Sequence, residues 1–238
     1  SALHLRRRSR PGRTETSTIV CTLTRQLMCK HLTPAPSQEG GRHRAHTLQK
    51  AMVFELSMVR AESLLSGNGE LSWDDCLQLA SERQRRHYDA RVPDKLEQCD
   101  LDIATHAAQN LFVMINRIQN QNPDAQLEKY PVIPGLGWIA SGNGDFSLGS
   151  LLIEVKHTDR NFVSSDFRQV MMYWLLKYAE AIENSSKVWS DVLLLNPRRN
   201  SALLVKFDYL LRSASASASR VELFELLRSI VGQDLDRW

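Results

Sequence analysis

The chain has 238 residues, of which 42% are hydrophobic and 24% are charged, and its formal net charge is +3. These values are typical of a soluble globular protein with one elaborated domain or two small ones. The longest apolar run, Val170 to Leu176, is much shorter than the roughly 18–20 residues that span a bilayer. The composition therefore excludes a membrane-spanning segment, and we expect no membrane partner.

The N-terminal part of the chain is strongly basic. Residues 1–50 contain ten Lys and Arg against two acidic residues, a net +8, and the remaining residues contain 20 against 25, a net −5. Such an arm, residues 1–46, would be attracted to phosphate backbones, although a partly disordered, solvated tail explains it equally well. Four cysteines without a paired spacing favour a reducing compartment. We therefore expect a cytoplasmic location.

Residues 47–98 are predicted to form a helical region. Apolar residues at helical spacing, among them Met52, Leu56 and Val59, predict a helix over 48–65. Ser72, followed three residues later by Asp75, is typical of a helix start and predicts a second helix from 73 to about 88. This helical pair is interpreted as a packing scaffold or as a subdomain that contacts DNA or a partner.

Residues 99–238 alternate between helical and strand patterns, which predicts an α/β fold. After a helix over 101–121, the segment 130–141 is expected to enter a sheet as its first strand, with Trp138 to Ser141 extended. A helix between the next strands predicts that the strand at 191–195 is parallel to the strand before it. The other expected elements are strands at 145–147, 151–156 and 202–207 and helices at 166–184 and 220–231.

The strand at 151–156 has two different faces. Residues Leu152, Glu154 and Lys156 share one face, and the opposite face is wholly apolar. A turn around residues 148–149 is expected to pair residue 147 with residue 150 and Asp145 with Leu152, so that Asp145 lies diagonally from Glu154, roughly 5.5–8 Å away. The strand pattern thus predicts two neighbouring carboxylates on one face.

This arrangement of side chains points to metal chemistry. Asp145 and Glu154 repel each other unless a cation lies between them, and oxygen ligands suit Mg²⁺, with Mn²⁺ as a substitute. The ammonium of Lys156 projects to the same place, where it can position a water molecule or offset phosphate charge. The pattern favours metal-assisted hydrolysis of a phosphodiester. The alternative interpretation is a salt bridge between Glu154 and Lys156 on an exposed strand face.

The order of these residues resembles the PD-(D/E)XK nuclease superfamily. Asp145 is followed by eight residues, then Glu154-x-Lys156, then Gln169-x-x-x-Tyr173 on the next helix, as in the branch found in recombination-type exonucleases and bacterial defence nucleases. The resemblance covers roughly residues 100–210. It implies a restriction-endonuclease-like core of helix, three-stranded meander, helix and strand.

The resemblance also implies roles for individual residues. Asp145, Glu154 and the Val155 carbonyl would be metal ligands, and Lys156 would be the catalytic lysine. Gln169 and Tyr173 would brace the site or contact the DNA backbone; helix–sheet packing is the alternative role for this pair.

Three other positions bear on the comparison with the superfamily. Gly144 stands where the family has a proline before the aspartate. In some members the first helix supplies an extra acid, for which Asp100 or Asp102 is a candidate. A favourable interaction with the helix dipole explains both residues as well.

The predicted function is magnesium-dependent hydrolysis of DNA, with an endonuclease favoured over an exonuclease. The resemblance adds defence against foreign DNA, such as antiviral defence, and a helicase or other partner subunit as expectations. The alternative is a catalytically silent subunit that binds nucleic acid or assembles into a larger complex. An enzyme acting on RNA is a third hypothesis, because the metal chemistry is indifferent to the 2′-hydroxyl.

Overall fold

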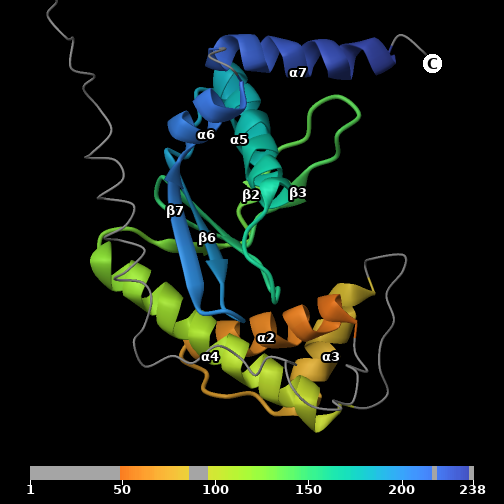
Figure 1. Ribbon diagram of the computed structural model, residues 1–238, viewed down its shortest axis with the longest axis vertical. Coiled ribbons are helices and arrows are strands. Elements are labelled where there is room, and N and C mark those ends of the chain that lie inside the picture. The colour runs from red at the N-terminus through yellow and green to blue at the C-terminus, as the bar shows by residue number, and fades with distance from the viewer. Residues whose placement is uncertain (1–48, 86–95, 216–218, 236–238) are drawn as a thin grey trace, which may run out of the picture.

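The computed structural model describes residues 49–85, 96–215 and 219–235 (Figure 1). The predicted basic arm, residues 1–46, lies outside them. Six helices are found in the described part of the chain. They are α2 (Lys50–Leu65), α3 (Trp73–Gln84), α4 (Gln98–Gln121), α5 (Ser164–Asn184), α6 (Phe207–Ala214) and α7 (Arg220–Leu235). Five of them were predicted, with bounds within three residues of prediction at most ends, and α6 was not predicted.

A mixed five-stranded sheet forms the centre of the molecule. Its order is β1 (Leu127–Lys129), β4 (Phe146–Leu148), β5 (Leu151–Val155), β6 (Asp191–Asn196) and β7 (Ser201–Lys206). The first three strands are antiparallel, β6 is parallel to β5, and β7 is antiparallel to β6. The predicted α/β class and the parallel pairing of β5 with β6 are confirmed.

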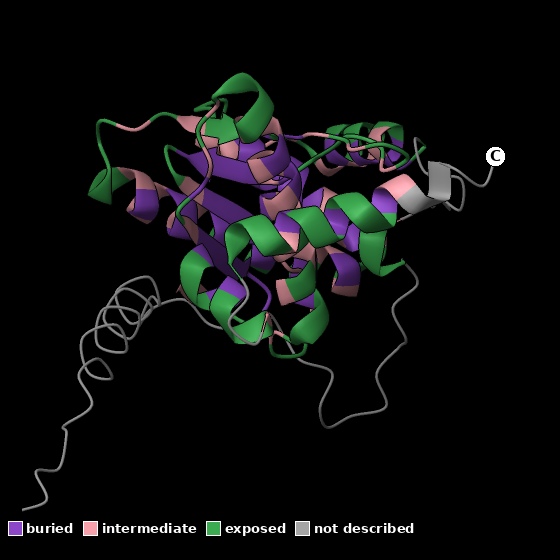
Figure 2. Cartoon of the chain, turned by 90° about the horizontal axis from the view of Figure 1, so that it is seen from above, coloured by how far each residue is buried: buried purple, intermediate pink, exposed green. Residues whose placement is uncertain are grey.

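Helices cover both faces of this sheet. On one face Ile153 and Val155 share a core cluster with Met58 of α2 and Leu111 of α4. On the other face Leu152 shares a second cluster with residues of α5, α6 and α7. Figure 1 shows α2 and α4 on one side of the strands and α5 on the other, and Figure 2 shows the buried strands at the centre. The face that carries Glu154 is therefore covered, because α5 packs over it.

The N-terminal helices belong to the same packed structure as the sheet. Met58 and Ala61 of α2 are buried in one cluster with Ala108 and Ile115 of α4. A third cluster joins α2 to α3 and to the start of α4. Helices on both sides of the predicted boundary at residue 98 thus pack against each other. The division into a helical region and a nuclease-like domain stays a prediction.

Local capping explains where two helices begin. The Asp75 backbone N–H donates to the Ser72 hydroxyl across 3.1 Å at the start of α3. At the start of α7, the Ser219 N–H donates to the Glu222 carboxylate across 2.6 Å, and the Glu222 N–H donates to the Ser219 hydroxyl across 3.2 Å. Side chains therefore satisfy otherwise unpaired N–H groups at both helix starts, and the cap expected at Ser72 is confirmed.

The segment between β1 and β4 differs from the prediction. The first strand of the sheet is Leu127–Lys129, and Trp138 to Ser141 do not extend as its first strand. Residues 130–144 instead leave the sheet as a separate two-stranded arm that contains β2 (Val132–Ile133) and β3 (Gly142–Asn143). Pro131, Pro134 and four glycines interrupt the alternation of a long strand. Among the described helices, none is long and apolar enough to span a bilayer.

Candidate active site

The turn that joins β4 to β5 comes one residue later than expected. Leu148 pairs with Leu151 and Ser147 with Leu152, so the predicted register was wrong by two residues. Gly149, with a φ of 58°, occupies the first position of a two-residue turn, where a type II′ hairpin takes glycine. A shift of two residues preserves the faces of the strand. When the observed register is extended by one residue, Asp145 is directly opposite Glu154 on the neighbouring strand and not diagonal to it.

Asp145 is attached to the end of β5. Its Oδ2 accepts a hydrogen bond from the backbone N–H of Val155 across 2.7 Å. At the same position the Asp145 carbonyl accepts a hydrogen bond from the N–H of Tyr130 across 2.9 Å. The residue is thus held from both sides where β4 begins, and its side chain lies next to the last residue of β5.

Glu154 is buried, with 4% of its surface exposed. Its Oε1 accepts hydrogen bonds from Lys156 Nζ across 2.8 Å and from Gln169 Nε2 across 3.0 Å. Its Oε2 is also buried, and no hydrogen-bond donor in the described part of the chain reaches it. A buried carboxylate oxygen without a donor is costly, so this atom is suited to a cation.

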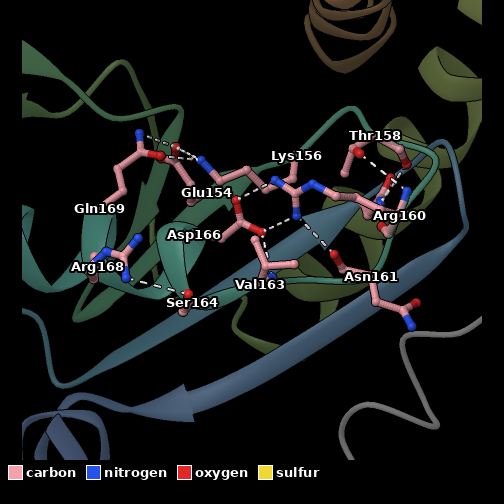
Figure 3. A network of polar contacts seen from close by, with 11 residues as sticks. Glu154, Lys156, Thr158, Arg160, Asn161, Val163, Ser164, Asp166, Arg168 and Gln169 are labelled. Carbon is pink, nitrogen blue, oxygen red and sulfur yellow. Dashed lines mark hydrogen bonds and ion pairs between the residues drawn. The ribbon is translucent and has the colours of Figure 1, made fainter.

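Helix α5 adds the supporting amide that the sequence predicted. Gln169 accepts a hydrogen bond from Lys156 Nζ through its Oε1 across 2.5 Å, and its Nε2 is 2.6 Å from the Tyr173 hydroxyl. Figure 3 shows Glu154, Lys156 and Gln169 pointing toward one another. The structure thus brings together all the predicted side chains: Asp145 and Glu154 at the hairpin, Lys156 just after it, and Gln169 and Tyr173 one helical turn apart.

Both carboxylates have raised pKa values. Burial raises the pKa of Asp145 well above its ordinary range, and the negative charge of Glu154 raises it further. Burial also raises the pKa of Glu154, although the Lys156 ammonium opposes that shift. Burial and the charge of Glu154 raise the pKa of the Tyr173 hydroxyl in the same way. The charged forms of both carboxylates are therefore disfavoured in these surroundings.

Sequence reasoning missed a third acid near this pair. Glu55 of α2 is close enough for its charge to raise the pKa of Asp145, and its Oε2 lies 3.7 Å from a guanidinium nitrogen of Arg83. Of the acids suggested on α4, Asp102 accepts a hydrogen bond from Gln98 of its own helix and Asp100 is fully buried. A helix pattern places Glu55 on a face of α2 but does not say which strand end that face meets.

The loop after β5 is fastened to the sheet and to α5. Asn196 donates hydrogen bonds to the carbonyls of Thr158 and Arg160 across 2.9 and 3.2 Å. Arg160 pairs with Asp166, whose carboxylate also accepts from the Val163 N–H across 2.9 Å (Figure 3). These contacts fix the start of α5, which begins at Ser164 and not after Ser165 as the pattern suggested. They therefore also fix the position of Gln169.

A divalent cation fits the residues that are present. Across the described ranges, His, Cys, Asp and Glu side chains form no metal-binding group of three or more. Mg²⁺, however, is commonly held by one or two carboxylates together with water. Asp145 and Glu154 supply such a pair, and the unpartnered Glu154 Oε2 is the observation that favours a cation. The role of the Val155 carbonyl stays a prediction.

No protein-family model, curated protein or solved structure matches the chain.

Proposed function

We propose that the protein is a magnesium-dependent deoxyribonuclease and that Asp145 and Glu154 hold its metal. The observation that carries the proposal is the buried, unpartnered Oε2 of Glu154 beside a second carboxylate whose pKa is raised. Two buried carboxylates that share the single ammonium of Lys156 are unfavourable when both are charged, whereas a divalent cation turns both into ligands. Mn²⁺ would substitute, because it accepts the same oxygen ligands.

The chain's own residues have distinct parts in the proposed reaction. When bound, the metal supplies Lewis acidity and lowers the pKa of a water molecule. Lys156, whose Nζ is 2.8 Å from Glu154, orients the attacking water and offsets charge on the phosphate. Gln169 holds the Lys156 ammonium and the Glu154 carboxylate at the same time. Tyr173 orients the Gln169 amide in turn.

The order of elements supports a restriction-endonuclease-like core. Helix α4 precedes the antiparallel strands β1, β4 and β5, and α5 then connects β5 to the parallel strand β6. Asp145 stands at the start of β4, and Glu154 and Lys156 stand at the end of β5. This is the placement that the PD-(D/E)XK resemblance implies. An endonuclease, DNA as the substrate, a role in defence, a helicase partner and a cytoplasmic location are further parts of the same proposal.

Plasmid cleavage tests the proposal. Supercoiled and linear plasmid are incubated with the full chain in Mg²⁺, in Mn²⁺ and in chelator. The same assay compares Glu154→Gln with Glu180→Gln, an acid on α5 that pairs with Lys177 away from the site. We expect metal-dependent nicking of the circular form, a loss of at least about 100-fold in Glu154→Gln, and no loss in Glu180→Gln.

Each alternative hypothesis predicts a different result. Salt-sensitive DNA binding without products in any metal would support a catalytically silent subunit. Cleavage of RNA in preference to DNA would move the substrate assignment to RNA. Cleavage that survives in chelator, or that Glu154→Gln leaves unchanged, would contradict the proposed metal site.

A further inference from the structure

The arm formed by residues 130–144 begins and ends beside the candidate metal ligand. At its base the Tyr130 N–H donates to the Asp145 carbonyl and the Gly144 N–H donates to the Pro131 carbonyl, each across 2.9 Å. Val132 then pairs with Asn143 in a two-stranded ribbon. Figure 1 shows this ribbon, β2 and β3, leaving the sheet beside α5. Any substrate at Asp145 therefore lies at the base of the arm.

The tip of the arm is a braced turn. Leu136 and Ile139 exchange two backbone hydrogen bonds of 3.0 Å around Gly137 and Trp138. Gly137 has a φ of 57°, which favours glycine. A Cβ added to Gly135 would lie 2.6 Å from the carbonyl oxygen of Ile139, so the two sides of the ribbon are in close contact there. The arm is therefore a defined structure with a fixed tip.

One side of the arm is anchored and the other is open. Ile133 is buried, and Leu136 and Ile139 pack against the core cluster that contains Trp174 of α5. Trp138 at the tip, by contrast, is 56% exposed. Packing against α5 thus explains why the inner side chains of the arm are apolar. It does not explain why a large aromatic ring is exposed at the tip.

The arm carries no charge. From Tyr130 to Gly144 the sequence contains no Asp, Glu, Lys or Arg, although 24% of the whole chain is charged. Lysine and arginine supply most of the electrostatic affinity for a phosphate backbone, and the arm has neither. An uncharged ribbon with an exposed indole is suited instead to the faces of nucleobases, on which aromatic side chains stack whatever the sequence.

We propose that the arm holds an unpaired strand of the substrate and that Trp138 stacks on one of its bases. Trp138 is seven residues before Asp145, so the tip lies at most about 23 Å away along an extended strand. It therefore meets a base within a few nucleotides of the phosphate at Asp145. Stacking needs an open base face, which single strands and frayed ends offer and continuous duplex does not. This inference rests on the proposed function and adds to it a preference for DNA with unpaired bases.

Oligonucleotide binding in chelator tests the arm without cleavage. A labelled single strand and the matching blunt duplex are titrated with the parent chain, Trp138→Ala and Trp138→Phe. Tyr209→Ala is the control, because it removes a 59%-exposed aromatic ring from α6. We expect Trp138→Ala to weaken single-strand binding by about 10-fold and Trp138→Phe to restore most of it. Duplex binding should change much less, and Tyr209→Ala should bind like the parent.

Two results would overturn the inference. The first is that Trp138→Ala binds the single strand as tightly as the parent does. The exposed indole would then serve a contact with another protein and not with DNA. The other is an equal loss for single strand and duplex. Metal-dependent cleavage by the parent is measured separately. If the parent does not cleave but Trp138 contributes to binding, the proposed enzyme fails and the arm inference stands; if it cleaves and Trp138→Ala binds normally, only the arm inference fails.

Discussion

Gln169 donates a hydrogen bond from Nε2 to Oε1 of Glu154 across 3.0 Å, which joins the second turn of α5 to the end of β5. The same amide accepts from Lys156 Nζ. One side chain therefore sets the positions of both the carboxylate and the ammonium. Because Gln169 itself comes from a helix that packs on the sheet, helix packing and site geometry depend on each other.

Replacing Gln169 should impair turnover more than binding. In Gln169→Ala, Glu154 and Lys156 keep their mutual contact but lose the group that orients them. We expect kcat to fall about 10- to 100-fold, because misplaced catalytic groups have costs of this size. KM and the melting temperature should change little.

The control for Gln169→Ala is Gln78→Ala. It removes an exposed amide that donates a hydrogen bond to Glu82 on α3. Tyr173→Phe should have a smaller effect than Gln169→Ala, since it removes only the hydroxyl next to the amide. Steady-state kinetics in Mg²⁺ measure all three variants. An unchanged kcat in Gln169→Ala would show that Gln169 is a packing residue only.

Asp145→Asn should make the metal-free protein more stable while it abolishes cleavage. The raised pKa of Asp145 means that its charged form is disfavoured in the folded state. The neutral amide removes the cost of burying that charge and its repulsion with Glu154. The amide oxygen can still accept a hydrogen bond from the Val155 N–H. We expect the free energy of unfolding at pH 7 in chelator to rise by about 1–2 kcal/mol. Urea denaturation measures this change.

The pH dependence has a defined sign. An acid whose folded pKa is above its unfolded pKa holds more protons in the folded state, so stability falls as pH rises from the unfolded value of about 3.9 through the folded one. In Asp145→Asn the free energy of unfolding should decrease less over this pH range. Adding Mg²⁺ should stabilise the parent at pH 7 but not this variant. A variant less stable than the parent in chelator, at every pH, would contradict the described charge repulsion.

Asp166→Ala should loosen the start of α5. The Asp166 carboxylate accepts from the Val163 N–H and pairs with Arg160, and we expect a loss of about 1 kcal/mol, which is typical of a helix cap. Hydrogen bonding by Arg160 lowers the pKa of Asp166. Its contribution is therefore present above the unfolded pKa of about 3.9 and is lost as pH falls through the lower folded value.

Urea denaturation of Asp166→Ala at pH 7 and at pH 3 checks this assignment. The difference from the parent should shrink at the lower pH. Glu180→Ala, also on α5 but paired with Lys177 in its second half, is the matched control. An equal loss in both variants would contradict a specific role for Asp166 at the helix start.

The sequence predicted the faces of the central strand better than its partners. Alternation from Leu151 to Lys156 placed Glu154 and Lys156 together, because side-chain direction in a strand follows a period of two. The register of the hairpin was missed by two residues. It depends on which residue takes the left-handed turn position, and the φ of Gly149 decides this.

Long-range contacts were harder to predict than local ones. Caps such as Ser219 with Glu222 lie within one turn and were predictable from spacing. Glu55 reaches Asp145 only because α2 packs beside the end of the sheet, which no local pattern specifies. Helix α6 was not predicted, because a strand was expected up to residue 207 and the next helix only from residue 220, whereas Phe207 and Leu210 are buried in the first turns of α6. Tertiary packing, not propensity, determined these features.

The most direct test of the account is cleavage of supercoiled plasmid in Mg²⁺ by Lys156→Ala under single-turnover conditions. Lys177→Ala is the control, because Lys177 also forms a lysine–glutamate pair, with Glu180, but away from the site. We expect a loss of at least about 100-fold for Lys156→Ala, with DNA binding close to that of the parent, and full activity for Lys177→Ala. Undiminished cleavage by Lys156→Ala would contradict it.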